Sequence, residues 1–177
     1  MMNRLNEIRS YMEKYIAENV DISIAEEQRY LSGQVNQAKD RLIIRISQAL
    51  EASAERKDKV VICYLLSSIA IGKYEFCIIP FEEKPFISKL ENEIYMDYSE
   101  LFRLAILSEA DLEKEMRKKF IRILPYEIEE VRREFLYRYG ERTGELLSSI
   151  LDGTTGGIKV FFGAYMGEIR EIGRIAV

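Results

Sequence analysis

The sequence predicts an α+β fold: a mostly helical single domain over residues 1–177, with an N-terminal helical hairpin and a small antiparallel sheet. Three observations lead to this class. Apolar residues recur at intervals of three and four in the first third of the chain, as on one face of a helix. Short segments rich in aromatic and β-branched residues, separated by turn signals, follow in the middle. A second helical region then gives way to IKVFFGAY, which alternates as a strand does.

The helical hairpin is expected within residues 1–56. Apolar positions three or four residues apart predict a first helix over 3–20: Leu5, Ile8, Met12, Tyr15 or Ile16, and Val20. The DIS stretch at 21–23 is expected to break this helix. Ser23 and Glu26 fit the capping box S-x-x-E, which predicts that a second helix opens there.

The second helix carries an apolar seam close to a heptad repeat: Ile24, Leu31, Val35, Ala38, Leu42 and Ala49. We interpret this seam as the surface through which the hairpin packs on its own domain. A dimer or partner interface through the same helices is the alternative that the pattern leaves open. Gln28 and Arg45 stand where a long coiled coil would need apolar residues, so a long coiled coil is not expected.

The rest of the chain, residues 57–177, is expected to combine helices with the sheet. The run VVICYLLSSIAI at 60–71 is apolar nearly all round, and its length and the following Gly72 favour a buried helix over a strand. Three strands of an antiparallel meander are predicted after it: KYEFCIIPF, FISKL and IYMDY. Pro80 has no N–H to donate and is expected at an edge of this sheet.

Two further helices are predicted before the C-terminal strands. The first runs from about residue 99 to 123, and Pro125 begins the second, because proline suits the first position of a helix. Gly140 and Gly144 are expected to bend the second helix. For the tail after Met166, a strand that forms a hairpin with IKVFFGAY is favoured over a short amphipathic helix.

The glycine- and threonine-rich stretch DGTTGGIK, residues 152–159, resembles a phosphate-binding loop in composition alone. A Walker loop follows a strand and opens a helix, whereas here the predicted helix comes before the loop and the strand after it. The C-terminus of a helix presents carbonyl groups and the negative end of the helix dipole, which repel phosphate. We therefore interpret the stretch as a corner, with Gly153 as the helix C-cap.

The chain has no histidine, which narrows the chemistry it can perform. Ser-His and Cys-His nucleophilic pairs are excluded, and the most common zinc ligand is missing. Two cysteines alone cannot build a structural zinc site. We expect no metal and no cofactor, and a non-catalytic protein rather than an enzyme. Cys63 and Cys77 lie in apolar runs and are expected to be buried free thiols rather than a disulfide.

Charge and hydropathy indicate a cytoplasmic protein without a membrane partner. The N-terminal stretch has no apolar run of the signal-peptide type. The longest mostly apolar run has 12 residues, too few to cross a bilayer. The formal net charge of -4 argues against general nucleic-acid binding, which needs a positive field around the phosphates.

Two charged clusters are candidate binding surfaces. The second long helix is rich in arginine and tyrosine, which can bind phosphates and stack on bases, and four arginines form its candidate anion site: Arg132, Arg133, Arg138 and Arg142. Acidic residues precede this run, so we prefer the interpretation that the arginines form ion pairs along the helix. The predicted meander supplies a candidate negative face for a basic partner: Glu75, Glu82, Glu83, Glu91, Glu93 and Asp97. Its alternative is a solvated sheet edge whose charges prevent unwanted pairing.

The function expected from these features is that of a non-catalytic protein-interaction protein. An inhibitor or an immunity-type antidote that masks a basic partner through its acidic surface would suit the charge and the size of the chain. The alternative is a regulatory or nucleic-acid-associated module that uses the arginine-rich helix. A carboxylate- or tyrosine-based enzyme is the third hypothesis, and no constellation of residues can be named for it.

Overall fold

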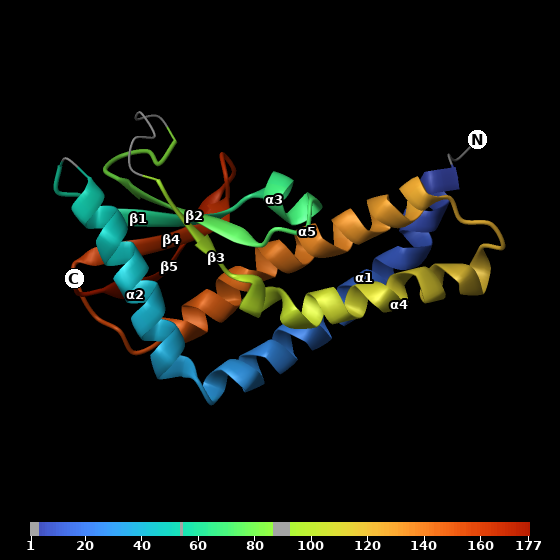
Figure 1. Cartoon of the computed structure of the whole chain (residues 1–177), viewed down its shortest axis with the longest axis horizontal. Coiled ribbons are helices and arrows are strands. Elements are labelled where there is room, and N and C mark those ends of the chain that lie inside the picture. The colour runs from blue at the N-terminus through green and yellow to red at the C-terminus, as the bar shows by residue number, and fades with distance from the viewer. Residues whose placement is uncertain (1–3, 54, 87–92) are drawn as a thin grey trace.

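The computed structural model describes residues 4–53, 55–86 and 93–177. It is an α+β fold in which a five-stranded sheet lies at one end of a long helical bundle (Figure 1). The helices, including the short 3-10 helix η1, are α1 (Arg4–Ser32), α2 (Val35–Ala52), α3 (Leu66–Ala70), η1 (Ser99–Phe102), α4 (Arg103–Lys119) and α5 (Pro125–Ile150). The strands are β1 (Lys59–Tyr64), β2 (Glu75–Phe81), β3 (Ile94–Asp97), β4 (Ile158–Ala164) and β5 (Ile169–Ile175). The α+β class predicted from the sequence is confirmed.

The sheet is mixed, whereas the sequence predicted an antiparallel one. Its strand order is β3-β2-β1-β4-β5. The pairs β1–β2, β2–β3 and β4–β5 are antiparallel, and β1 and β4 are parallel. The parallel pair arises because the chain leaves the sheet after β3, passes through α4 and α5, and returns beside β1, a connection long enough for parallel strands.

The predicted strands of the meander are confirmed where the structure describes them. β2 and β3 lie within KYEFCIIPF and IYMDY. Most of FISKL falls at 87–92, outside the described residues. Pro80 lies opposite Val60 and beyond Ile78, the last β2 residue that pairs with β3, so it occupies the part of β2 that β3 does not reach.

The prediction of a buried helix over 60–71 is wrong for most of its length. Residues 59–64 form β1, and a helix occupies only 66–70. β1 is the central strand, and five of its six residues are buried because both faces of the sheet are covered there. A strand buried on both faces reads as a continuous apolar run rather than an alternating one, so its sequence resembles that of a buried helix.

The N-terminal helix pair is present, but its turn lies elsewhere than predicted. α1 continues through 21–23 and ends at Ser32, and the turn to α2 is at Gly33-Gln34. Ser23 does not cap a helix: it is buried inside α1, with its Oγ 3.2 Å from Oγ of Ser108 on α4. Packing of Val20 and Ile24 on the same face outweighs the weak local helix preference of the DIS stretch.

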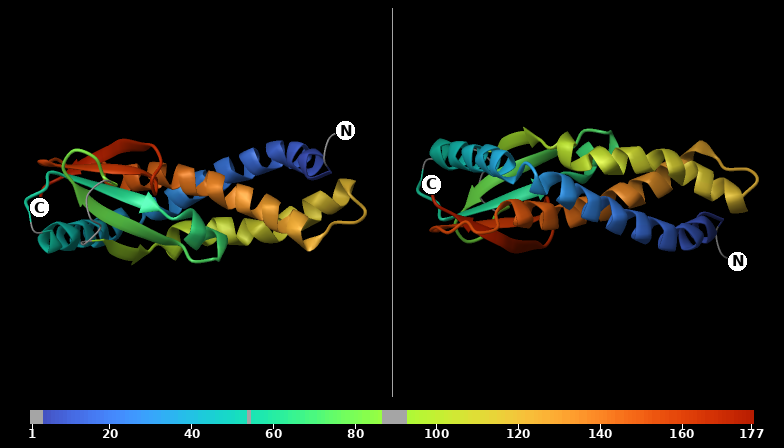
Figure 2. Two further views of the ribbon diagram at one scale, coloured as in Figure 1. Left: turned by 90° about the horizontal axis from the view of Figure 1, so that it is seen from above. Right: turned by 90° about the horizontal axis from the view of Figure 1, so that it is seen from below.

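The helices form two groups. α1, α4 and α5 contact one another and run side by side as a bundle, while α2 turns away to cover β2 and β3 (Figures 1 and 2). The N-terminus of α1 and the α4–α5 connection lie at the end of the bundle far from the sheet (Figure 2). Most of the apolar seam proposed for a dimer is buried inside the chain itself: Ile24, Leu31, Ala38, Leu42 and Ala49. In this structure the seam therefore packs on its own fold.

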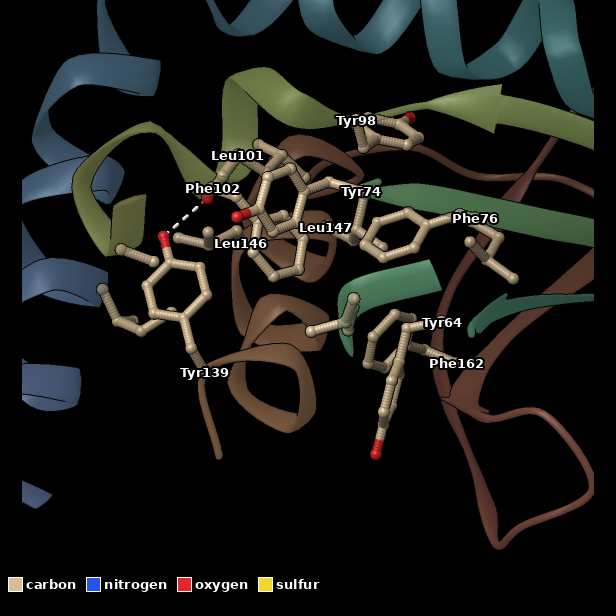
Figure 3. Packing of buried hydrophobic residues seen from close by; sticks show 14 of the residues in the cluster. Tyr64, Tyr74, Phe76, Tyr98, Leu101, Phe102, Tyr139, Leu146, Leu147 and Phe162 are labelled. Atoms are coloured by element: carbon tan, nitrogen blue, oxygen red, sulfur yellow. Dashed lines mark hydrogen bonds between the residues drawn. The ribbon is translucent and has the colours of Figure 1, made fainter. Parts of the chain in front are cut away.

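The main core lies between one face of the sheet and the helices. Aromatic side chains from the sheet, η1 and α5 meet there (Figure 3). Tyr74 stacks on Phe102 with ring centroids 4.6 Å apart, and the hydroxyl of Tyr139 donates a hydrogen bond of 2.5 Å to the carbonyl of Leu101. The second of these contacts fixes α5 against η1.

A smaller apolar cluster covers the other face of the sheet: Val61, Cys63, Cys77, Ile79 and Phe81. Phe86, from the segment after β2, packs edge-on against Tyr165 at this face. Cys63 and Cys77 are register partners across β1 and β2, and both are free and buried, as predicted. Burial raises the pKa of Cys77 to about 12 and also raises that of Cys63.

The C-terminal half follows the predictions more closely. Pro125 is the first residue of α5, which runs to Ile150 without a break, so neither Gly140 nor Gly144 interrupts it. Gly153 has the positive φ of 71° expected of a helix C-cap. The tail forms β5, in a hairpin with β4.

Candidate functional site

Three of the predicted acidic residues come together at the edge of the sheet formed by β3. Glu75 and Asp97 are register partners across β2 and β3, next to the pair Cys77 and Tyr95. The hydroxyl of Tyr95 donates a hydrogen bond of 2.5 Å to the carboxylate of Glu93. Side chains two residues apart on a strand lie on one face, so Tyr95 and Asp97 share the outer face of the sheet with Glu75. We call Glu75, Glu93, Tyr95 and Asp97 the acidic edge.

The carboxylates of the acidic edge lack cationic partners. Among the residues that the structure describes, no lysine or arginine forms an ion pair with Glu75, Glu93 or Asp97. Asp97 Oδ1 accepts a hydrogen bond of 2.8 Å from the amide of Ser99, which opens η1. Like charges directly opposite one another on paired strands destabilise the pair by roughly 0.2–1 kcal/mol. Within the described residues, this edge therefore holds a repulsion that no cation compensates.

The remaining predicted acidic residues do not join this group. Glu82 and Glu83 follow β2 at its opposite end. The carboxylate of Glu82 lies 3.6 Å from Nζ of Lys57, and its backbone carbonyl accepts a hydrogen bond of 2.6 Å from Lys59. Glu91 lies outside the described residues. The negative face predicted from the sequence is thus divided between the two ends of β2.

The four arginines proposed for anion binding all lie on α5, and each faces carboxylates. Arg132 Nε is 2.6 Å from Glu109 of α4, and Arg138 is 2.7 Å from Glu134 and 3.2 Å from Glu13 of α1. The other two form equally close pairs: Arg133 with Glu130, and Arg142 with both Asp21 and Glu145. Several of these pairs join α5 to α1 and α4, so the guanidinium groups help to hold the bundle together.

The stretch DGTTGG forms the corner that the sequence predicts. The hydroxyl of Thr154 lies 2.6 Å from the carbonyl oxygens of Leu151 and Arg174, at the end of α5 and on β5. A Cβ on Gly156 would stand 2.0 Å from the backbone of Ile175, so only glycine fits there. The loop is therefore packed against β5.

Sequence reasoning missed a cleft between α5 and the end of the sheet. Its volume is about 580 Å³, and it is lined by Tyr64, Glu141, Arg142, Phe162, Gly163, Ala164, Glu168, Ile169 and Arg170. Tyr64 and Ala164 are register partners at the carboxyl ends of the parallel strands β1 and β4. Ligands of α/β proteins commonly bind at the carboxyl ends of parallel strands. The lining residues are spread over 107 positions of the chain, so only the parallel pairing, which was not predicted, brings them together.

Gly140 and Gly144 allow side chains that line the cleft to pack directly on α5. A Cβ on Gly140 would stand 3.4 Å from the ring of Tyr64, and a Cβ on Gly144 would stand 2.5 Å from Phe162 and 3.0 Å from Nη2 of Arg170. The side chains of the sheet therefore lie directly on the backbone of α5. The sequence did carry a signal for this packing: two glycines four residues apart lie on one face of the helix. Glycine at such positions allows a neighbouring segment to approach the helix backbone closely.

Two buried carboxylates lie in the helical bundle, away from both surfaces. Glu127 is held by Arg4, whose Nε is 2.7 Å away, and by the amide of Leu124. The hydrogen bond from Arg4 lowers the pKa of Glu127. Both carboxylate oxygens of Glu27 are buried, Arg103 is 3.7 Å away, and the backbone of Leu104 also favours the charged form. Burial raises the pKa of Glu27.

Comparisons of the chain with protein-family models, curated proteins and solved structures find no match in any of the three. Within the described ranges, every helix lacks either the length or the apolarity needed to cross a bilayer. The Cys, Asp and Glu side chains of the same ranges form no group of three or more that could ligate a metal ion.

Proposed function

We propose that the protein is a non-catalytic interaction protein that binds a basic segment of another protein through the acidic edge. The observation that carries this proposal is the direct opposition of Glu75 and Asp97 without a cationic partner among the described residues. A lysine or arginine from outside would relieve this repulsion and form an ion pair in the same step. The gain from binding is larger here than at a carboxylate that already has an intramolecular partner.

The backbone of β3 supports an extended partner. β3 ends the strand order, so its outer side has no strand neighbour within the described residues. An extended peptide can add to such an edge through main-chain hydrogen bonds, while alternate side chains supply specificity. Tyr95, 54% exposed between Glu93 and Asp97, offers an aromatic surface on which the stem or guanidinium of a basic side chain can pack.

An inhibitor or antidote that masks a basic partner is the class of function that this surface suits. Opposite charges accelerate encounter with the partner, and acidic side chains at a sheet edge disfavour pairing with a second acidic copy. The arginine-rich face of α5 supports the nucleic-acid alternative less well, because a phosphate would have to displace carboxylates that the arginines already contact.

The proposal is tested with an extended peptide of about eight residues in which lysine alternates with valine. We expect binding that weakens with added salt, and a glutamate-valine peptide of equal length should not bind. Glu75→Gln and Asp97→Asn should each weaken binding about 2- to 5-fold. Glu83→Gln, at the other end of β2, is the matched control and should leave the affinity unchanged.

Equal binding of the lysine and glutamate peptides would refute the proposal. So would an unchanged affinity in the double variant of Glu75 and Asp97. A partner co-purified with the wild-type protein must also be lost from that double variant and retained by Glu83→Gln, because capture alone does not identify the surface.

A further inference from the structure

The cleft beside α5 contains a polar group that the fold itself leaves unused. Tyr64 is only 4% exposed, and its ring stacks on Phe162 with centroids 5.6 Å apart. Its hydroxyl points away from the aromatic core, whereas that of Tyr139 points at its carbonyl partner (Figure 3). No residue that the structure describes forms a hydrogen bond with the Tyr64 hydroxyl. The hydroxyl itself is not fully buried: it opens into the cleft, where a ligand can form a hydrogen bond with it.

Charged groups of both signs surround this hydroxyl. Glu141 and Arg170 both act on its ionisation: burial, assisted by Glu141, raises the pKa of Tyr64 to about 12, and Arg170 opposes the shift. Arg170 reaches the cleft over Gly144, and Glu168 lies on the same rim. Within the described part of the chain, none of Glu141, Glu168 and Arg170 forms an ion pair or a hydrogen bond through its side chain. Arg142, by contrast, is occupied by Asp21 and Glu145.

We propose that this cleft binds a small zwitterion of the α-amino-acid class. The ligand's carboxylate would lie on the guanidinium of Arg170 and accept a hydrogen bond from the Tyr64 hydroxyl. Its ammonium group would lie between Glu141 and Glu168, and its side chain would lie on Phe162. This inference is independent of the proposed function, because it uses a different face of the sheet and none of the residues of the acidic edge.

Charge balance selects this ligand class over other small molecules. The unpaired groups are two carboxylates and one guanidinium, so a phosphate or dicarboxylate would meet more repulsion than attraction. A simple amine would leave Arg170 and the Tyr64 hydroxyl without partners. A ligand with one charge of each sign satisfies both sides of the cleft, and a carboxylate matches the planar fork of an arginine. A volume of about 580 Å³ accommodates a molecule of this size and falls in the usual range for ligand sites.

A melting-temperature screen against the twenty standard amino acids, tested one at a time, examines the proposal. The best of them should raise the melting temperature by about 5–10 °C when present at 100 times its dissociation constant. Three matched probes should produce less than a fifth of that shift: the same carbon skeleton without its ammonium group, the same skeleton without its carboxylate, and inorganic phosphate. Failure of every amino acid to shift the melting temperature would overturn the proposal. An equal shift from phosphate or from the lone carboxylate would also overturn it, in favour of a simple anion site.

Two variants locate the binding. Arg170→Met retains the apolar stem, and Tyr64→Phe retains the stacked ring while removing the hydroxyl. Each should weaken the affinity, measured by calorimetry, at least about 10-fold, because each removes a hydrogen bond to a charged group. Arg174→Met is the control on the same strand: Arg174 is exposed, pairs with Glu171, and lies outside the cleft. An affinity that is unchanged in Arg170→Met, a surface change that leaves the core intact, would refute this placement.

Discussion

Replacing Glu27 by methionine should stabilise the protein at neutral pH. The Glu27 side chain is fully buried on α1, and the contributions of Arg103 and of the Leu104 backbone do not outweigh the effect of burial on its pKa. At 3.7 Å and an effective dielectric constant of about 20, the attraction of Arg103 amounts to about 4 kcal/mol before screening. Arg103 is 46% exposed, so water reduces this figure substantially. The desolvation of a buried carboxylate costs several kcal/mol and exceeds what remains.

The direction of the pKa shift agrees with this balance. Burial raises the pKa of Glu27 above its ordinary value of 4.5, so the folded state favours the protonated acid. Ionisation of Glu27 therefore lowers the free energy of unfolding as the pH rises from about 4.5 through the raised pKa. Methionine has a similar length and no charge. We expect Glu27→Met to raise the free energy of unfolding by about 1–2 kcal/mol at pH 7, and by less at pH 4.5.

Urea unfolding of both proteins at pH 7 and at pH 4.5 measures the effect. Glu127→Gln is the matched contrast, because Glu127 is equally buried but its pKa is lowered by Arg4. Glu127 contributes stability above pH 4.5 that is lost as the pH falls through its lowered pKa. Its variant should therefore be less stable than the wild type at pH 7, and the gap should close on acidification. A Glu27→Met protein that is less stable than the wild type at pH 7 would refute the reasoning, since it would show that the pair with Arg103 outweighs desolvation.

Three further predictions concern the sheet and its contacts. Glu75→Gln should raise the free energy of unfolding by roughly 0.2–1 kcal/mol, measured in urea at low salt, because it removes the repulsion from Asp97; a loss of stability would contradict the absence of a stabilising partner. Gly144→Ala should cost about 1–3 kcal/mol, because the new Cβ would stand 2.5 Å from Phe162. Gly157→Ala, which has open space around the new Cβ, is its control, and equal effects of the two changes would refute the close packing. Cys63 and Cys77 should react with an aromatic disulfide reagent only as fast as the protein unfolds, because burial raises both pKa values. Rapid labelling of the native protein at pH 8 would show instead that the thiols are accessible.

The sequence predicted correctly those helix ends and strands that depend on residues close together in the chain. Pro125 marks the start of α5 and Gly153 its C-cap, because a proline ring and a positive φ act within one turn of the chain. The alternation in IKVFFGAY identified β4, which has a distinct buried side. The break expected at 21–23 failed because packing of α1 on α4 and α5 decides its continuity, and no local signal reports that packing.

The candidate sites depended on pairing between distant segments, which the sequence does not reveal. Opposition of Glu75 and Asp97 requires the register of β2 and β3. The cleft requires β1 beside β4, and the run at 60–71 looked like a helix because a strand covered on both faces loses its alternation. Gly140 and Gly144 were visible in the sequence, but were read as points of bending. The close approach of the sheet at both glycines can be recognised only when the neighbouring side chains are known.

In this protein, charged side chains that already have an ion-pair partner differ from those without a partner among the described residues: the former hold the fold together, and the latter are available for binding. An arginine such as Arg132 or Arg138 must release a carboxylate at 2.6–2.7 Å before it can bind a ligand. Breaking this ion pair would cancel much of the energy gained from the new contact with the ligand. Glu75, Asp97 and Arg170 face no such exchange within the described residues. All three lie at the same end of the sheet, where β1 and β4 end and β2 begins, but Glu75 and Arg170 lie on opposite faces. Binding at the acidic edge should therefore leave the affinity of the cleft for its ligand unchanged, and calorimetry of the cleft ligand with and without the lysine-valine peptide tests this independence. A change of more than about 3-fold would show that the two surfaces are coupled through the sheet.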